Sequence, residues 1–593
     1  MERERFVDLL DAPFSRRGSY FCFTNDNLKA EDILGKSNLW LCNSRSVDYA
    51  MIDITKPNNF RQILLQGVKD GVALPCVLDT TPEEVVISTS RGSVRFCIAK
   101  PDLVLARGED GLSLRITPRP SWMGGQPSVP IADACGSHDV DFGPCRMRVT
   151  PLRGALKRVP GALELVPDEQ GVIEAAFVDY VVEPNPNASR SFLTYAEGVA
   201  AVTEEFEDFC AKVYPALPAE FEPKRKQALW QTWSMMVEPD GENDYRRPMV
   251  KMIHSIFESA FGWQMPMQAV WLHNDPALAW EIFCSPFDFQ DAAGRLNDAV
   301  GFKALPGKPA MKPPIHGMAL LWLMDHGVIE AANPSPEAKK WLLDRLIKWT
   351  EYFCACRGAE NGTLCAYLRA LETGWEDAPL YRLGMPQVCP DLNAYIALSM
   401  EAIARFGATV GMPEAEQTRW MQRSRALIDA MISKLWDGER WFSYNAETGA
   451  RSVNDNLTLW LPVILGKRLP QDILDKTVAH LLRPGGFKTP FGYATEALDS
   501  PYLRHGFAAG SVITPTHFFI PMALEDCGCM DEARDAALSY CRTLKHSGFF
   551  HICNAITGDA DRSLTAFGEK QLFWSAWTSS CYLFLADRYG KTD

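Results

Sequence analysis

One short segment in the second half of the chain carries the residues best suited to acid–base chemistry. Leu371–Leu380 reads Leu-Glu-Thr-Gly-Trp-Glu-Asp-Ala-Pro-Leu, with three carboxylates around a Gly-Trp step: Glu372, Glu376 and Asp377. A general acid needs a carboxyl group whose pKa is raised by partial burial against an apolar wall, and Trp375 is placed to supply that wall. We therefore predict that Glu376 is a general acid; the competing interpretation is a solvated acidic loop.

Two periodicities divide the chain into the elements that would position this acid loop. From Ser19 to about Tyr180, short alternating or β-branched runs broken by Gly, Pro, Asn and Asp predict closely spaced strands, which are typical of a β-sandwich. After Pro223, eleven helical runs alternate with loops rich in Gly, Pro, Trp and Asp; two of these runs cover Met249–Ala260 and Pro266–Phe283. Paired helices of this kind fit a closed toroid whose long loops gather at one end.

The expected fold class is therefore multidomain α+β. We expect an antiparallel β-sandwich over residues 1–190, a helical linker over 191–222, and an (α/α)6 toroid with the catalytic loops over 223–593. The breaker cluster at 183–187, which reads Glu-Pro-Asn-Pro-Asn, marks the boundary between the two periodicities.

Tryptophan is concentrated in the expected toroid. Fifteen of the 17 tryptophans lie between Trp230 and Trp577, several of them at junctions of loops and helices. Indole rings stack on the apolar faces of sugars, while carboxylates bind sugar hydroxyls, so this composition favours a carbohydrate partner. The alternative is that a large helical domain uses tryptophan to fill its core.

Composition excludes several other classes of partner. The 593-residue chain has 60 Lys and Arg against 74 Asp and Glu, a formal net charge of -14, and we find no basic patch that would bind nucleic acid or a membrane. The N-terminal residues lack the apolar stretch of a signal peptide, and 17 cysteines without zinc-site spacing indicate reduced thiols. We expect a cytoplasmic protein with no metal or cofactor.

Three ordered motifs lead to a resemblance: Phe261–Gln268, Phe289–Leu296 and Lys312–Gly317. With the acid loop, they resemble the helical-toroid glycosidases of glycoside hydrolase family 63 and mannosylglycerate hydrolase, which are related to family 37 trehalases. The similarity extends from about Phe221 to the C-terminus. Glu376 stands where the family has its catalytic Asp, so the resemblance implies a glycosidase that cleaves an α-glycosidic bond, with inversion of configuration.

The resemblance and the polar side chains nearby also indicate residues that would bind the substrate. We expect this role for a set of aromatic, amide and charged residues: Trp263, Gln264, Gln290, Lys312, Glu372, Trp375, Asp377, Arg504 and Trp574. Several relatives act on charged glycosides, and five cationic or imidazole side chains would suit a substrate anion: Lys312, His316, Arg504, His505 and His517. A loop with Tyr493, Glu496, Tyr502 and Arg504 is expected to close over the site.

The chain departs from the family pattern at two functional positions. Gln264 replaces an Asp that would hold sugar hydroxyls, and His551 stands where the family has its general base, a Glu. An inverting glycosidase requires two carboxyl groups, one to protonate the leaving oxygen and one to activate water. Glu569 could supply the missing carboxylate, against the alternative of an ordinary carboxylate in the first turn of a helix. Of the two candidate bases, Glu569 and His551, we favour Glu569.

The altered base position keeps other functions open. A His near cationic residues could bind phosphate, which would make the chain a phosphate-dependent glycoside-cleaving enzyme. A chain that has lost its base would be a non-catalytic sugar-binding protein. A polysaccharide lyase, which would use Tyr and His, fits the acid-loop series less well. The sequence is compatible with a homo-oligomer.

Overall fold

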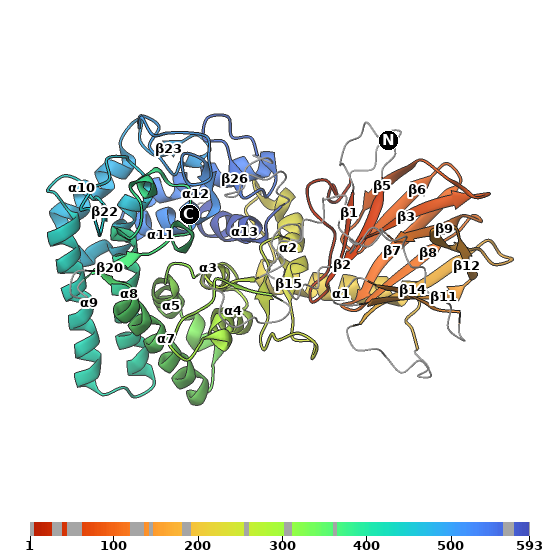
Figure 1. Cartoon of the computed structure of the whole chain (residues 1–593), viewed down its shortest axis with the longest axis horizontal. Helices are drawn as coiled ribbons and strands as arrows, with labels where there is room; N and C mark the ends of the chain where they lie inside the picture. Colours follow the sequence, from red (N-terminus) through yellow and green to blue (C-terminus); the bar gives the residue numbers. More distant parts are fainter. Residues whose placement is uncertain are drawn as a thin grey trace.

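The computed structural model describes residues 5–25, 38–43, 62–118, 136–141, 146–180, 191–253, 260–301, 311–359, 364–560 and 574–591. Figure 1 shows a part built of strands beside a part built of helices, joined near α1 and α2. Strands β1–β14 belong to the N-terminal third of the chain, whereas the large helices and the short strands β15–β26 follow. This arrangement confirms the predicted fold class.

The N-terminal part consists of two antiparallel sheets. In the first, the strand order is β1 (Phe21–Asn25), β2 (Leu39–Asn43), β3 (Gln62–Lys69), β9 (Ser113–Pro118), β13 (Ala162–Val166) and β12 (Ala155–Val159), with β4 (Val72–Ala73) paired to β3. In the second, it is β10 (His138–Asp141), β11 (Arg146–Arg153), β14 (Ile173–Tyr180), β8 (Leu103–Gly108), β7 (Gly92–Lys100), β6 (Glu84–Thr89) and β5 (Cys76–Thr80).

Alternating side chains pack the two sheets face to face. In β9, Leu114 and Ile116 are buried while Ser113, Arg115 and Thr117 are partly exposed, the period of two that a half-buried strand requires. Phe23 of the first sheet contacts Phe96 of the second, with ring centroids 5.5 Å apart. The predicted β-sandwich is confirmed.

Helix α1 (Tyr195–Val213) lies against the second sheet, on β7 and β8. Its N-terminus is closed by a capping box, in which the Thr194 hydroxyl accepts from the Glu197 N–H and the Glu197 carboxylate accepts from the Thr194 N–H. Gly198 allows the close approach, because a methyl group there would lie 2.8 Å from Cβ of Ala99. This helix falls within the segment expected to be a linker, and α2 (Arg225–Ser234) follows it.

The helical part is a closed double ring. In the part of the chain that the structure describes, six inner helices each contact the next: α3 (Gln264–Trp271), α5 (His316–Asp325), α8 (Pro390–Thr409), η5 (Leu457–Arg468), α11 (Thr514–Asp526) and α13 (Ala576–Gly590), which contacts α3 again. The outer helices are α2, α4 (Pro276–Cys284), α7 (Pro336–Cys356), α9 (Glu414–Leu435), α10 (Gln471–Leu482) and α12 (Met530–Ser547). The predicted toroid is confirmed.

Burial separates the two rings. Every residue of α3 is buried, as expected for a helix surrounded by protein on all sides. The outer helix α9 buries one stripe only, at Leu427, Ile428, Met431 and Leu435, which recur at helical spacing. None of the helices among the described residues is both long and apolar enough to cross a bilayer.

Two of the predicted helical runs differ from the structure, and one inner helix was not predicted. The run over Pro266–Phe283 is two helices, because Asp275 caps α4 and Pro276 occupies its first turn. At the described ends of the run Met249–Ala260 the structure has strands in place of a helix, β16 (Met249–Val250) and β17 (Ala260–Phe261); residues 254–259 lie outside the described residues. Inner helix η5 was not predicted, because Pro462 interrupts its apolar run.

The connections have unequal lengths, and this decides where the site lies. Links from an inner helix to its outer partner are short, for example 410–413 and 527–529, whereas long segments lead into each inner helix, for example 357–389 and 483–513. A short link makes neighbouring helices antiparallel, so the inner helices all run in one direction. The long loops therefore meet at the N-terminal ends of the inner ring, and the acid loop is one of them.

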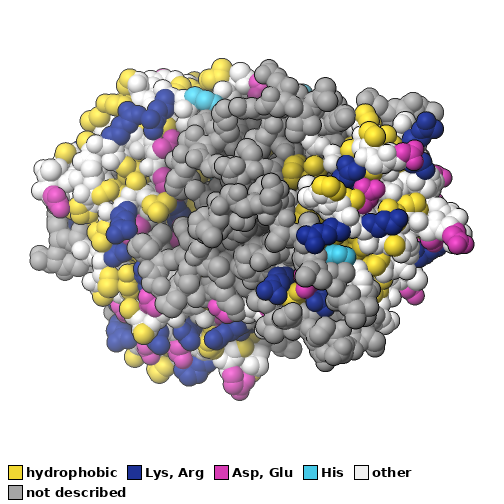
Figure 2. Space-filling model, turned by 45° about the vertical axis from the view of Figure 1, so that its right-hand side comes forward, with side chains coloured by type: hydrophobic (Ala, Val, Ile, Leu, Met, Phe, Trp, Pro, Cys, Tyr) yellow, Lys and Arg dark blue, Asp and Glu magenta, His cyan; other side chains and the backbone are white. Residues whose placement is uncertain are grey.

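The described surface mixes charges. In the face drawn in Figure 2, Lys and Arg side chains of the described residues lie in small groups among acidic and apolar side chains. This distribution agrees with the mixed charge of the sequence.

Candidate active site

The acid loop is held in shape by buried contacts on both sides of Glu376. Glu372 has 2% exposure; its carboxylate accepts from Arg357 Nη2 at 3.1 Å and from the Leu368 N–H at 3.0 Å. Gly374 has φ +72°, and a methyl group there would lie 2.6 Å from Cη2 of Trp263. Both backbone conformation and ring contact therefore require glycine at the turn before Glu376.

Glu376 is in ion-pair contact with Lys312, which comes from the loop before α5. Its side chain is 16% exposed, whereas that of Lys312 is 7% exposed. Lys312 Nζ also donates to the Leu371 carbonyl at 2.6 Å. The lysine thus ties the acid loop to the neighbouring loop and holds the Glu376 carboxylate.

A second carboxylate approaches the same lysine. Asp298 Oδ2 lies 4.0 Å from Lys312 Nζ, and the Asp298 side chain is 3% exposed. Burial raises the pKa of Asp298 to about 6, although the charge of Lys312 opposes the shift. The sequence reasoning missed Asp298; the available signal was a carboxylate directly before the buried strand β18 (Ala299–Val300).

Asp377 holds a third loop against the acid loop. Its Oδ1 accepts from the Ala508 N–H at 2.6 Å, while Arg504 Nη2 donates to the Asp377 carbonyl at 2.7 Å and lies 3.6 Å from Oδ2. Burial raises the pKa of Asp377. Asp377 and Arg504, both predicted to bind substrate, are engaged with each other across the two loops.

His551 lies in an aromatic setting. Its ring is stacked on Trp577 with centroids 5.0 Å apart, Phe507 lies 5.4 Å away, and Nδ1 is 3.2 Å from the Thr514 hydroxyl. Burial lowers the pKa of His551 to about 3, so the imidazole is neutral at pH 7. Among the described residues, no carboxylate forms an ion pair with this ring. Trp577 also contacts the Trp263 ring edge-on, with centroids 5.1 Å apart. His551 is therefore in contact, through Trp577, with the ring that lies beside the acid loop.

Other predicted substrate-binding residues have buried structural contacts. The Gln290 amide donates to the carbonyls of Gly294 and Arg345, at 2.8 and 2.9 Å. Trp375 is fully buried, and Trp574, with 5% exposure, donates its backbone N–H to Asp11 of the N-terminal part at 2.7 Å. Together with Glu372, these side chains are packed inside the loops. Trp375 and Trp574 could therefore stack on a sugar only if they moved.

Gln264 differs from these residues. It is fully buried at the start of α3, beside Trp263, and neither atom of its amide has a hydrogen-bond partner among the described residues. Buried polar groups are nearly always paired, so this amide has capacity for a ligand or water. Glu569, our favoured base, lies outside the described residues.

The residues predicted to bind an anion have different surroundings in the structure. Lys312 and Arg504 are paired with Glu376 and Asp377. His316 is enclosed by aromatic rings and His517 is stacked on Tyr540; burial lowers the pKa of each to about 3. The cations face carboxylates and the two imidazoles are neutral, so four of the five residues do not form a cationic site.

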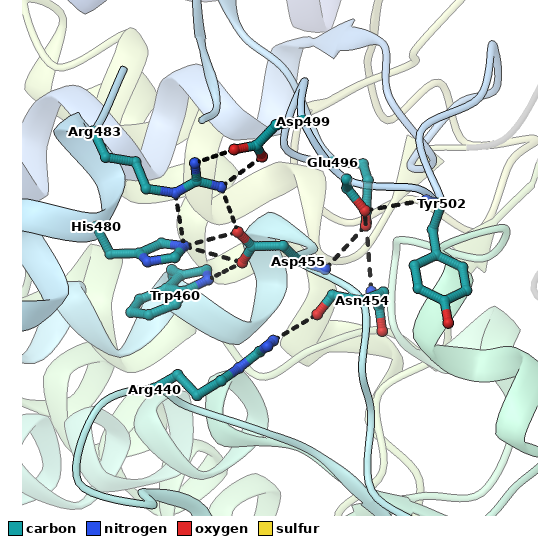
Figure 3. A network of polar contacts seen from close by, with 10 residues as sticks. Arg440, Asn454, Asp455, Trp460, His480, Arg483, Glu496, Asp499 and Tyr502 are labelled. Carbon is teal, nitrogen blue, oxygen red and sulfur yellow. Dashed lines mark hydrogen bonds and ion pairs between the residues drawn. The ribbon is translucent and has the colours of Figure 1, made fainter. Parts of the chain in front are cut away.

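The loop expected to close over the site is braced. Glu496 is fully buried, and its carboxylate accepts from the Asp455 N–H at 3.0 Å, from Asn456 Nδ2 at 3.1 Å and from Ser500 Oγ at 2.6 Å. Figure 3 shows this carboxylate beside a second one, Asp455, which is held by several donors: Trp460, His480 and Arg483. The two acidic residues fasten loop 483–513 to the loop before η5.

Comparison with known proteins agrees with this arrangement. A family model described as the mannosylglycerate hydrolase MGH1-like glycoside hydrolase domain matches residues 263–575, more than half of the chain. The chain belongs to this family. It is therefore a glycoside hydrolase, and the family suspected from the sequence is confirmed.

Solved structures are similar in fold. A bacterial glucoamylase in complex with acarbose is 9% identical, with 99% of this chain and 95% of that chain covered and a TM-score of 0.55. The mannosylglycerate hydrolase of glycoside hydrolase family 63 from Thermus thermophilus is 15% identical, with 55% and 93% covered and a TM-score of 0.46. Neutral trehalase from Saccharomyces cerevisiae is 12% identical, with 58% and 74% covered and a TM-score of 0.45. No curated protein matched.

In this MGH1-like hydrolase, the matched region contains the acid loop and most of its partners, whereas Trp577, on which His551 is stacked, lies just beyond it. It begins at Trp263, whose ring lies over Gly374, and includes Asp298, Lys312, the acid loop and His551. The N-terminal sandwich lies outside the matched region. Its contact with the toroid includes the hydrogen bond from Trp574 to Asp11.

Proposed function

We propose that this hydrolase cleaves the α-glycosidic bond of a small glycoside or short oligosaccharide, with inversion, and that Glu376 is its general acid. The observation that carries this proposal is the partly exposed Glu376 carboxylate beside Lys312 at the loop end of the toroid. All three carboxylates of the acid loop have protein partners, but Glu372 and Asp377 accept from backbone N–H groups, those of Leu368 and Ala508, whereas Glu376 is paired with the Lys312 side chain alone among the described residues. Glu376 is thus the carboxylate of this loop best placed to meet a substrate.

Glu569 is the proposed base. A general base works best with a pKa near the working pH, and a neutral imidazole with a pKa of about 3 is a weak proton acceptor at pH 7. The aromatic contacts of His551 favour a role in which it hydrogen-bonds the substrate or the attacking water. The pairing of Lys312 and Arg504 with carboxylates also favours hydrolysis over a phosphate-dependent reaction.

Substrate-binding roles follow from position beside the acid loop and from unused hydrogen-bonding capacity. We propose that Trp263 and Gln264 contact the sugar, because the ring borders the acid loop and the amide lacks a partner among the described residues. We also propose a cytoplasmic location, since all 15 described cysteines are free thiols. The partner is a carbohydrate; nucleic acid and membrane are not proposed partners.

The test uses purified full-length protein and a panel of α-linked substrates suggested by the names of the relatives: mannosylglycerate, trehalose and malto-oligosaccharides. Proton NMR of the first product formed reports whether the anomeric configuration is inverted. Glu376→Gln should lower kcat at least about 100-fold, because a neutral amide cannot deliver the proton. Glu447→Gln, a change at an exposed loop carboxylate, is the matched control and should leave kcat unchanged. Equal activity of the two variants would reject Glu376 as the acid.

A further inference from the structure

The lysine beside the general acid has two carboxylate partners within reach. Lys312 Nζ is in contact with Glu376, and Asp298 Oδ2 lies 4.0 Å from the same nitrogen. Asp298 and Lys312 are nearly inaccessible, with side-chain exposures of 3% and 7%, whereas Glu376 is 16% exposed. Asp298 Oδ1 has no hydrogen-bond partner among the described residues. Among the described residues, Lys312 therefore lies between two carboxylates, of which Glu376 is the more exposed.

This arrangement bears on the protonation cycle of Glu376. A general acid must carry a proton before it reacts, and a protonated carboxyl group no longer supplies the negative charge that pairs with Lys312. A carboxylate beside a buried ammonium stabilises it. Asp298 can supply that charge after a displacement of about 1 Å, since ammonium–carboxylate hydrogen bonds are about 2.8 Å long.

We propose that Asp298 is a positioning residue. Its carboxylate pairs with Lys312 while Glu376 carries the catalytic proton, and Lys312 leaves Asp298 when Glu376 is again a carboxylate. This inference rests on the proposed role of Glu376. In the reaction, Glu376 gives its proton to the glycosidic oxygen as the bond to the anomeric carbon breaks, and the attacking water gives a proton to the base. Lys312 then returns to Glu376, which takes a new proton from solvent before the next turnover.

The surrounding charges are consistent with this exchange. Among the described residues, Lys312 and Glu376 are the charged groups that act on Asp298, and burial raises the pKa of Asp298 to about 6. On the other side, Glu376 adjoins Asp377, which is already paired with Arg504. Arg504 is thus occupied, and Lys312 is the cation in contact with Glu376.

The pH dependence of kcat tests the proposal. Asp298→Asn removes one negative charge near Lys312 and Glu376 while Lys312 stays on Glu376, so the alkaline limb of the kcat profile should move to lower pH by about one unit. Lys312→Gln removes the cation and should move the same limb to higher pH. Asp291→Asn is the matched control, since Asp291 lies on the same loop and bonds only Arg295 among the described charged residues; its profile should equal that of the wild type. Substrate KM should change less than about threefold in Asp298→Asn.

A second readout requires no substrate. Carbon-13 NMR of protein labelled at the glutamate carboxyl carbon, with the Glu376→Gln spectrum to identify the signal, gives the titration midpoint of Glu376. This midpoint should be lower in Asp298→Asn than in the wild type and higher in Lys312→Gln. Equal midpoints in Asp298→Asn and Asp291→Asn would overturn the proposal. Loss of activity in Glu376→Gln together with that result would leave the proposed function standing, whereas full activity of Glu376→Gln would reject the proposed function itself.

Discussion

The indole ring of Trp263 lies over Gly374, so close that a methyl group on Gly374 would come within 2.6 Å of Cη2. The two residues are 111 positions apart in the sequence. Gly374 also has φ +72°, in the left-handed region. One contact therefore sets both the turn before Glu376 and the position of an aromatic ring beside it.

Gly374→Ala should destabilise the protein and lower kcat. The left-handed conformation costs an alanine about 1 kcal/mol, and overpacking against Trp263 adds about 1–3 kcal/mol. Gly411→Ala is the control, because Gly411 has φ +82° with no neighbour within 4 Å of the added methyl group. Urea unfolding measures both variants; equal destabilisation would show that the Trp263 contact adds nothing.

Stability should depend on pH through Asp298. Its pKa is about 6 in the folded protein against an ordinary value of 3.8, so the folded state holds the proton more tightly than the unfolded chain. The wild type should therefore lose stability relative to Asp298→Asn as pH rises from about 4 through 6, by about 3 kcal/mol in total. Urea unfolding at several pH values between 4.5 and 7.5 measures the difference, and parallel curves for the two proteins would contradict it.

His551 should stay neutral down to about pH 4. Its pKa is lowered to about 3, so the unfolded chain binds the proton more tightly, and stability due to this residue is lost as pH falls from 6.5 towards 3. Nitrogen-15 NMR of histidine-labelled protein, with His551→Gln to assign one of the ten histidines, reports the titration. A midpoint near 6.5 would instead make His551 a competent base.

Asp377 should protect the loop 504–508 from proteolysis. Asp377→Ala removes both the acceptor of the Ala508 N–H and the partner of Arg504, so trypsin should cleave after Arg504 faster than in the wild type. Asp377→Asn keeps an acceptor oxygen and should give an intermediate rate. Identical cleavage rates in all three proteins would show that this loop is held by other contacts.

Local patterns predicted most of the fold. Alternation in β9 and the single apolar stripe of α9 are properties of neighbouring residues, so both elements could be predicted from the sequence. The inner helix η5 could not, because Pro462 breaks the helical pattern and only its neighbours in the ring stabilise it. Likewise, the run Met249–Ala260 has a helical pattern, but its described ends are strands, of which Met249–Val250 pairs with Met236–Val237 and Ala260 pairs with Val300.

The sequence by itself determined the two-part architecture, the acid loop with Glu376, and the family, since these depend on periodicity and on ordered short motifs. Tertiary structure alone decided the surroundings of the site residues. It buried Glu372 against Arg357, enclosed His551 between Phe507 and Trp577, and brought Asp298 to the lysine that holds Glu376. Charge state and accessibility depend on partners that lie far apart in the chain, and those partners meet only when the toroid closes.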